Sequence, residues 1–245
     1  MSTGENFIAH LIELRKRLLN SMLALLAVFV CLVPFANKLY TLLAKPLLTS
    51  LPAGGHMIAT DVTTPFFVPL KVAGMAALII ALPYILYQAW RFVAPGLYAH
   101  EKRLMLPLIV ASTLLFLCGM AVAYFLIFPL VFGYMVASTP EGVTMMTDIE
   151  KYLSFALTMF IAFGLAFQVP VVVVVLVRLG VVSTEKLQEV RRYVIVGSTV
   201  AGAIFMPPDA GSQILFAVTL TLLYEAGIQV AKWVKPREQD AAGKA

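Results

Sequence analysis

Long apolar stretches separated by short polar segments run the length of this 245-residue chain. A helix needs about 20 mostly apolar residues to cross the hydrocarbon core of a bilayer. The stretches are too long and too continuously apolar for the alternating strands of a membrane β-barrel. The pattern therefore predicts an all-α integral membrane protein with six transmembrane helices, at about 18–36, 67–90, 105–136, 152–178, 193–206 and 213–231.

The predicted helices differ in length. The fifth, 193–206, has 14 residues and is about 21 Å long at 1.5 Å per residue, which is less than the thickness of the bilayer core. The short segment 207–211 separates it from the sixth, so we expect these two helices to form a short hairpin. Prolines at 83, 107, 129 and 170 are expected to kink the second, third and fourth helices or to mark their ends. Unequal, bent helices favour a concave bundle.

The connection at about 37–66 is long for two helices that lie side by side, where 2–8 residues are usual. It is moderately apolar and contains three prolines and two glycines, so we expect it to fold back as a cap over the outer face. At the N-terminus, apolar residues at helical spacing alternate with charged ones, which predicts an amphipathic surface helix leading into the first span. We expect residues 1–235 to form one six-helix transmembrane domain, followed by a short polar tail at 236–245.

Composition agrees with a membrane chain, since 61% of the residues are hydrophobic and 13% are charged. The net charge of +5 indicates orientation rather than a nucleic-acid partner. If the N-terminus is cytoplasmic, 14 of the 18 Lys and Arg fall in inner segments, and every Arg is among them. This asymmetry is typical of inner loops. An even number of spans then places the C-terminus in the cytoplasm as well.

Several other classes of function lack their signatures. Residues 1–17 do not resemble a cleaved signal peptide, because the apolar stretch that follows is too long and no small-x-small site ends it. Cys31 and Cys118 fall inside predicted helices, so we expect no structural disulfide. The chain has no phosphate-binding loop, no nucleophile elbow and no Cys/His spacing for a metal. We therefore expect no enzyme, no cofactor and no metal site.

The polar segment 91–103, between the second and third predicted helices, contains one carboxylate among basic residues. Topology accounts for the Lys and Arg but not for Glu101. Glu101 is either favoured by the dipole at the start of the third helix or an acceptor for a guanidinium ligand, with which a carboxylate forms two parallel hydrogen bonds. Phe92 is either an anchor at the membrane interface or a cation–π contact beside that ligand.

Glu13 has a similar setting just before the first apolar stretch. Arg17 lies four residues further along, an orientation that favours an ion pair within the helix. Alternatively, Glu13 is a second acceptor for a cationic ligand. His10 shares its helical face, and its simplest role is a surface hydrogen bond. Two carboxylates at one membrane face indicate a receptor for something cationic.

Four more polar residues lie in or beside the last three spans. Gln168 precedes Pro170, so it either satisfies backbone freed by the proline or lines a polar cavity. Glu225, in the sixth span, faces the bundle or extends its carboxylate to the interface. Asp209 and Gln213 border the outer end of the short hairpin, where Pro-Pro-Asp is either a turn with a helix cap or part of a contact with a partner.

Motifs along nearly the whole chain, in order, resemble one family: TatC, a subunit of the twin-arginine protein translocase. The matching pieces are His-Leu-Ile-Glu-Leu-Arg-Lys-Arg at 10–17, Ile-Ala-Thr-Asp-Val at 58–62, Pro-Phe-Phe at 65–67, Phe-Val-Ala-Pro-Gly-Leu-Tyr at 92–98 with His100-Glu101, Asp148 before Tyr-Leu-Ser-Phe at 152–155, and Pro-Pro-Asp at 207–209. Any one piece alone is a weak signal, whereas the ordered set with six spans is specific.

The resemblance implies a receptor that binds the twin-arginine motif of signal peptides on folded cargo proteins at the cytoplasmic face. Carried over by position, Glu101 takes the arginine pair and Phe92 and Pro95 shape its loop. The N-terminal part of the same surface is formed by His10, Glu13, Arg15 and Arg17.

The resemblance also implies partners and location. The single-span subunits TatA and TatB are expected along spans five and six, with homo-oligomers inside a TatBC complex. A bacterial cytoplasmic (inner) membrane and transport driven by the proton-motive force go with it. Many members have Glu where this chain has Gln168, so hydrogen bonding rather than ionisation is expected there.

The alternative from another class is a polytopic secondary transporter or channel built on Gln168 and Glu225. No clear internal repeat supports it, and the charged groups cluster at one face rather than at mid-depth. A membrane-embedded enzyme ranks third, because no nucleophile–base pair is apparent.

Overall fold

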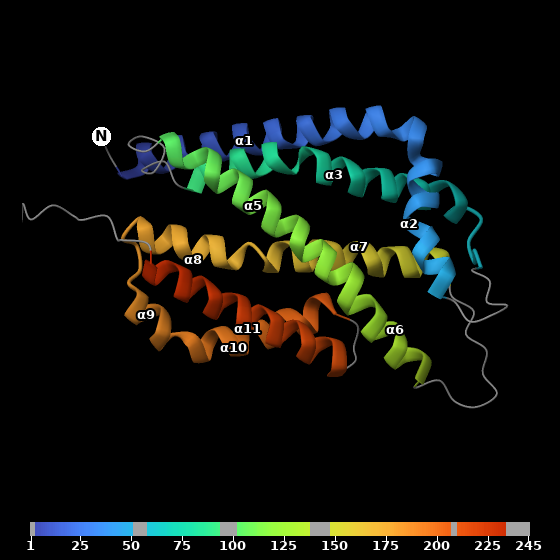
Figure 1. The fold of residues 1–245 in the computed structure, drawn as a ribbon. Helices are drawn as coiled ribbons and strands as arrows, with labels where there is room; N and C mark the ends of the chain where they lie inside the picture. Colours follow the sequence, from blue (N-terminus) through green and yellow to red (C-terminus); the bar gives the residue numbers. More distant parts are fainter. Residues whose placement is uncertain (1–2, 51–57, 94–101, 138–147, 207–209, 234–245) are drawn as a thin grey trace, which may run out of the picture. The chain divides into compact units, whose positions relative to one another are not determined.

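The computed structural model describes residues 3–50, 58–93, 102–137, 148–206 and 210–233 (Figure 1). Within these ranges the chain is helical, and the β-type pairing they contain is one isolated parallel bridge between Ile58 and Asp148. The chain divides into two compact units, residues 1–93 with 135–157 and residues 94–134 with 158–245.

The first unit contains α1 (Thr3–Leu32), the short 3₁₀ helix η1 (Val33–Phe35), α2 (Ala36–Ser50), α3 (Thr64–Val93) and the beginning of α7 (Ile149–Ala166). Pro34 lies in the first turn of η1, where its missing N–H costs nothing. The chain turns there, and α2 runs away from the line of α1 (Figure 1). The segment that was expected to cap the outer face therefore begins as a helix.

Helix α1 packs along α3 and leaves its other side bare. Gly74 of α3 lies against the ring of Phe29 of α1. On the opposite side of α1, Leu18, Met22, Leu26 and Val30 recur every four residues and are each more than half exposed. In a helix that crosses a membrane, such a stripe faces lipid.

Where α2, α3 and α7 begin to pack together, they enclose a small apolar core. Val68, Val72 and Leu153 are almost fully buried, and Leu39 and Tyr40 of α2 pack against them. This core seats α2 on the first turns of α3. It is the part of the unit farthest along α3 from Phe92, with Val72 and Phe92 about 30 Å apart along the helix axis at 1.5 Å per residue.

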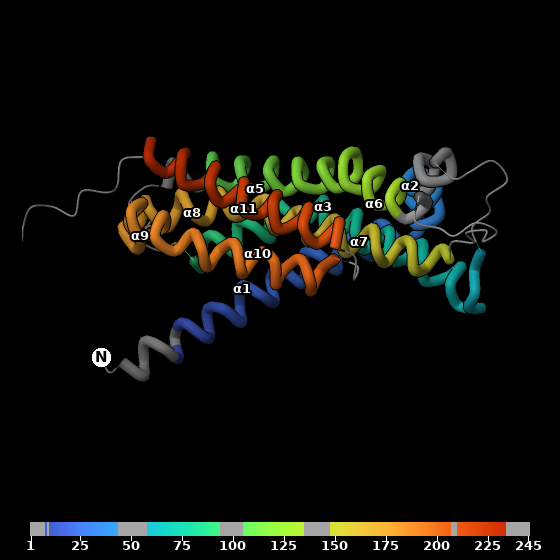
Figure 2. The backbone as a smooth tube through the Cα atoms, turned by 90° about the horizontal axis from the view of Figure 1, so that it is seen from below, coloured from blue at the N-terminus to red at the C-terminus, as the bar shows by residue number. Residues whose placement is uncertain are grey.

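The second unit contains α5 (Lys102–Val122), the π-helix η2 (Ala123–Ile127), most of α6 (Phe128–Ala137), the rest of α7, and then α8 (Val169–Arg178), α9 (Thr184–Glu189), α10 (Arg191–Phe205) and α11 (Ala210–Trp233). Figure 2 shows α10 and α11 side by side, as expected for a short hairpin. Helices α5, η2 and α6 form one rod.

Two prolines explain interruptions in this unit. Pro129 cannot donate to the carbonyl four residues back, and just before it Phe128 donates to Ala123, five residues back, in a π turn. Pro170 lies in the first turn of α8, directly after the break at Phe167 and Gln168. Both positions confirm the sequence expectation. Pro83 and Pro107, by contrast, lie inside α3 and α5 and end neither helix.

Close packing between helices in this unit depends on small residues. A Cβ added at Gly119 of α5 would lie 2.5 Å from the carbonyl oxygen of Phe163, and one added at Gly227 of α11 would lie 2.9 Å from Cα of Pro170. Small residues let backbones approach closely where lipid gives helices no hydrophobic reason to associate. Helix α8 ends at Arg178, and Gly180, two residues later, has a φ of 70°, the left-handed conformation that favours glycine just after a helix.

Five helical segments in the described ranges are long and apolar enough to cross a membrane: His10–Leu43, Thr64–Val93, Met105–Tyr134, Ile149–Arg178 and Ala210–Trp233. They match five of the six predicted spans. The remaining predicted span, the fifth at 193–206, corresponds to α10. Its 15 residues reach about 22 Å, as short as expected. The single-domain division at residue 235 and the concave form of the bundle stay predictions.

Candidate functional site

The residues predicted at the N-terminus meet the end of α3 in a polar cluster, here called the α1–α3 cluster. Positions 10, 13 and 17 share one face of α1, and positions 84, 88 and 92 share one face of α3. The two faces pack together. The cluster consists of His10, Glu13, Arg17, Tyr84, Gln88 and Phe92.

The rings of His10 and Phe92 stack, with centroids 4.4 Å apart and planes 19° from parallel. This contact brings together two residues that lie 82 positions apart and that were assigned to one surface only by resemblance. His10 is exposed and Phe92 is half-buried, so the stack forms part of the molecular surface. Stacked flat rings offer a face on which a guanidinium plane can lie.

Glu13 is paired with Arg17, as its spacing allowed. The Nε of Arg17 donates to Oε1 of Glu13 at 2.9 Å, and Nη2 of Arg17 makes a second short contact to the same oxygen. The Arg17 side chain is 14% exposed, whereas that of Glu13 is 42% exposed. Because both contacts use Oε1, the carboxylate has room for a second cation. The intrahelical pair and the ligand role are therefore compatible.

Gln88 connects the two helices and was missed in the sequence. It is buried, accepts a hydrogen bond from Nη1 of Arg17 at 3.2 Å and donates through Nε2 to the hydroxyl of Tyr84 at 2.7 Å. A glutamine four residues after a tyrosine near the end of an apolar span is the signal that could have found it. One turn away, Arg91 donates to the hydroxyl of Tyr87 at 3.0 Å.

Of the other predicted residues, Arg15 is described and does not belong to this cluster. Arg15 is exposed and lies on a different face of α1 from positions 10, 13 and 17. Glu101, Pro95 and Asp209 lie outside the described residues. The roles expected of these four residues stay predictions.

Gln168 lies in the second unit, at the break between α7 and α8. Its Nε2 donates to the backbone carbonyl of Ser112 on α5 at 2.8 Å. This partner is the backbone of a neighbouring helix, and not the backbone that Pro170 frees in the helix of Gln168, so the contact differs from the one expected. Gln168 is 9% exposed, and its Oε1 is buried without a hydrogen-bond partner among the described residues.

Glu225 and Gln213 contribute to the contact between α10 and α11. Glu225 forms an ion pair with Arg191, in which Nη2 of Arg191 lies 2.8 Å from Oε2 of Glu225. At the other end, a Cβ on Gly202 would lie 2.9 Å from the carbonyl oxygen of Gln213, so the two backbones nearly touch. Glu225 was expected to face the bundle or to extend its carboxylate to the interface, and neither expectation included the partner Arg191.

This fold is that of a polytopic helical membrane protein, and its distinctive polar surface is the α1–α3 cluster. The family model of TatC, the Sec-independent protein translocase protein, matches residues 9–218. The chain belongs to the TatC family.

Individual relatives agree over nearly the full length. The chain is 52% identical over 221 residues to the Sec-independent protein translocase protein TatC of Escherichia coli (strain K12), covering 90% of this chain and 86% of that protein. It is 46% identical over 241 residues to TatC of Haemophilus influenzae (strain ATCC 51907 / DSM 11121 / KW20 / Rd), covering 98% and 94%. A crystal structure of the twin-arginine translocase receptor TatC is similar with a TM-score of 0.81 and 41% identity, and the match covers 91% of this chain and 98% of that one.

Family membership confirms the resemblance that the motifs indicated, and TatC is a family of translocase receptors rather than of enzymes. The chain is a multi-pass membrane protein and a component of a Tat translocase. A secondary transporter or channel built on Gln168 and Glu225 is not favoured. Each of those two side chains is also engaged in its own local contact.

Proposed function

We propose that this chain is the core receptor of a twin-arginine translocation system. It binds twin-arginine signal peptides of folded cargo proteins at the cytoplasmic face and nucleates assembly of the translocase, with transport driven by the proton-motive force. The observation that carries this proposal is membership of the TatC family, together with similarity to a solved twin-arginine translocase receptor.

The geometry of the α1–α3 cluster supports the same role. An arginine pair needs carboxylates that are anchored yet accessible. Glu13 is anchored by Arg17 and remains 42% exposed. The stacked rings of His10 and Phe92 supply a flat surface for the planar guanidinium group. We assign the closest contact with the arginine pair to Glu101 and the shaping of its loop to Phe92 and Pro95, from their places in the family motif.

Arg15 and Arg17 belong to the same proposed surface in different ways. Arg17 is largely buried and orients Glu13, so it acts on the ligand through the carboxylate. Arg15 is exposed and would meet the acidic or polar parts of a signal peptide or its cargo. Arg17 thus positions the Glu13 carboxylate, whereas the charge of Arg15 would steer the approaching ligand.

We further propose that the single-span subunits TatB and TatA bind along α10 and α11, near Gln168, Gln213, Asp209 and Glu225. Support comes from α10, where Val196, Val200 and Ile204 are each more than half exposed on one side. A homo-oligomer within a TatBC complex, a bacterial inner membrane and cytoplasmic termini complete the proposal. Support for the cytoplasmic termini comes from the concentration of Arg and Lys in the segments taken as inner.

Site-specific photocrosslinking tests the receptor role. A photoreactive residue at position 14 or 92, which leaves Glu13 and Glu101 in place, should crosslink to a twin-arginine signal peptide and not to a control peptide with both arginines replaced by alanine. Glu101→Ala should reduce binding by at least about tenfold, the change that roughly 1.4 kcal/mol produces. Glu101→Asp should retain more binding than Glu101→Gln, because the guanidinium needs an anion.

The matched control is Glu189→Ala, which removes an exposed carboxylate from α9. It should bind the peptide as the wild type does. Wild-type crosslinking by Glu101→Ala, or equal loss in Glu189→Ala, would show that the carboxylate at 101 does not receive the arginine pair.

A further inference from the structure

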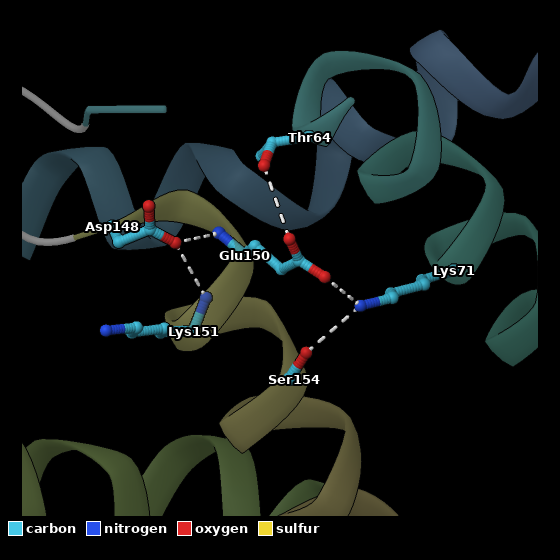
Figure 3. A network of polar contacts seen from close by, with 6 residues as sticks. All are labelled: Thr64, Lys71, Asp148, Glu150, Lys151 and Ser154. Carbon is cyan, nitrogen blue, oxygen red and sulfur yellow. Dashed lines mark hydrogen bonds and ion pairs between the residues drawn. The ribbon is translucent and has the colours of Figure 1, made fainter. Parts of the chain in front are cut away.

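The beginning of α7 is fastened to α3, and to the segment before α3, by polar contacts within the first unit. We call this set the α3–α7 clamp. Figure 3 shows most of it from close by, with side chains from both helices pointing toward one another. Its members are Thr60, Thr64, Lys71, Asp148, Glu150 and Ser154.

The two oxygens of Asp148 have separate tasks. Oδ1 accepts hydrogen bonds from the backbone N–H groups of Glu150 at 2.9 Å and Lys151 at 3.0 Å, which caps the N-terminus of α7. Oδ2 accepts from the backbone N–H of Thr60 at 3.1 Å and from the Thr60 hydroxyl. Next to this, the N–H of Ile149 donates to the carbonyl of Ile58 at 3.0 Å. One carboxylate thus starts a helix and holds the segment before α3.

Glu150 makes the corresponding link to α3 itself. Its Oε1 lies 2.6 Å from Nζ of Lys71, and its Oε2 accepts from the hydroxyl of Thr64 at 3.2 Å. Nζ of Lys71 also lies 3.4 Å from Oγ of Ser154, one turn along α7. Thr64 is 1% exposed, whereas the Lys71 and Glu150 side chains are about one third exposed. The link therefore joins two turns of α3 to two turns of α7.

Charges at this position are costly, which makes their presence informative. Lys71 lies seven residues into the helix that spans Thr64–Val93, about 10 Å from its start. Polar and charged groups inside spans are expensive and mark functional positions. An apolar pair of similar size would fill the same space without the desolvation cost. What an ion pair adds, and apolar packing lacks, is a fixed direction and register between two helices.

The clamp and the α1–α3 cluster lie at opposite ends of one helix. Lys71 and Phe92 are 21 positions apart on α3, or about 32 Å along its axis at 1.5 Å per residue. A change in the clamp therefore touches no residue of the cluster. Signal-peptide binding and any later step that depends on the register of α7 should be separable by substitution.

We propose that the α3–α7 clamp is a positioning element for cargo transport rather than for signal-peptide binding. By fixing the start of α7 to α3, it keeps the receptor able to move cargo after the peptide has bound. The ionic link between Lys71 and Glu150 is its directional part, and Asp148 with Thr60 is its second attachment. The proposal goes beyond receptor function, although its transport readout depends on that function.

The hydrogen bonds around Asp148 keep its carboxyl ionised. The Thr60 hydroxyl, the Lys151 amide and the other N–H donors lower the pKa of the Asp148 carboxyl to about 2. The charged groups beside it are Glu150 and Lys151 on α7 and Lys71 on α3, and the Glu150 carboxylate is itself paired with Lys71. The carboxylate of Asp148 therefore stays ionised at physiological pH, and its hydrogen bonds to Thr60 are not lost by protonation.

The test compares binding with transport in membrane vesicles that contain the complete translocase. Lys71→Gln and Glu150→Gln each break the ionic link, and the exchanged pair Lys71→Glu with Glu150→Lys rebuilds it with reversed polarity. Lys151→Gln is the matched control, because the Lys151 side chain is exposed and points away from the network in Figure 3. Crosslinking of a twin-arginine signal peptide from position 14 reports binding, and uptake of a folded reporter protein reports transport.

We expect both single substitutions to crosslink the peptide as the wild type does and to slow transport by roughly tenfold, equivalent to about 1.4 kcal/mol. The exchanged pair should recover at least half of the wild-type rate, and Lys151→Gln should keep all of it. Normal crosslinking also shows that each variant is folded.

Three results would overturn the clamp as a transport element. The first is transport by the single variants equal to that of Lys151→Gln. The second is loss of crosslinking together with transport, which would make the link a requirement for folding. The third is no recovery in the exchanged pair. A different combination would separate the two proposals. If the wild-type chain does not crosslink the peptide and only the single variants transport slowly, the proposed receptor role is overturned and the clamp is supported.

Discussion

Gln88 should be the residue that keeps the receptor surface assembled, and Gln88→Leu is the substitution that tests it. Leucine keeps the size and apolar contacts of the buried side chain but removes both hydrogen bonds. One of these comes from the Arg17 guanidinium at 3.2 Å and the other goes to the Tyr84 hydroxyl at 2.7 Å. The rest of α3 and the pairing of Arg17 with Glu13 are left in place.

The size of the effect follows from these two bonds. In water-soluble proteins, a hydrogen bond to a charged group contributes about 1.5–3 kcal/mol and a neutral one about 0.5–1.5 kcal/mol. Bonds between membrane helices average only about 0.6 kcal/mol, because the unfolded chain in the bilayer also finds partners. Arg17 keeps Glu13 and therefore loses only part of its pairing. We expect a loss of roughly 1–3 kcal/mol in stability, and a fall of about threefold to tenfold in peptide crosslinking from position 14, beside the intact Glu13.

The assay is denaturant unfolding of the purified protein in detergent, alongside photocrosslinking in vesicles. Gln188→Leu on the surface of α9 is the matched control, because the same chemical change is made where the side chain is exposed. Equal stability and crosslinking in Gln88→Leu and Gln188→Leu would refute the role of Gln88. A loss of stability without any change in crosslinking would restrict Gln88 to helix packing.

Three further predictions concern the rest of the molecule. The pKa of Asp148 is lowered to about 2 by the Thr60 hydroxyl and neighbouring amides. The stabilisation from its carboxylate is therefore complete above the ordinary carboxyl pKa near 4 and is lost as the pH falls toward 2. Asp148→Asn should flatten this acid dependence of the free energy of unfolding. Gly119→Ala should lower the stability of the protein by about 1–3 kcal/mol, since the added Cβ would lie 2.5 Å from a backbone oxygen. Gly133→Ala, with open space around its Cβ, should be neutral or slightly stabilising, and thermal unfolding of both variants checks this. A double-mutant cycle on Arg191 and Glu225, using glutamine at both positions, should give a coupling energy below about 1 kcal/mol, because the pair is partly exposed; a coupling of several kcal/mol would contradict that reasoning.

The sequence was most informative about the helices and least informative about their partners. Apolar length is a local property, so four spans and the short α10 could be located to within a few residues, whereas the helix that contains the first span, His10–Leu43, extends well beyond the predicted 18–36 at both ends. Pro129 and Pro170 marked interruptions for an equally local reason, the missing N–H. The π turn before Pro129 was not foreseen, because a proline in a helix can be accommodated in more than one way.

Contacts between distant positions could not be read from spacing. The pair of Glu13 and Arg17, four residues apart on one helix, was foreseen as one of two possibilities. Lys71 and Glu150 are 79 positions apart, and neither carries a local sign of the other. Gln168 was recognised as unusual, but its partner is a backbone carbonyl of Ser112, and every residue in the chain has such a group. The receptor residues at 92 and 101 came from motif resemblance rather than from local physics.

The π turn at Ala123–Ile127 has a consequence for how the rod formed by α5, η2 and α6 presents its side chains. A π turn accommodates one residue more than an α turn, and each residue turns an α-helix by about 100°. Side chains on the two sides of this turn therefore do not follow a single helical wheel. Deletion of one residue from 123–127 would restore a continuous α-helix and rotate all of α6 by about 100° relative to α5. The lipid-facing and protein-facing sides of α6 are thus set by the extra residue as much as by the residues of α6 themselves.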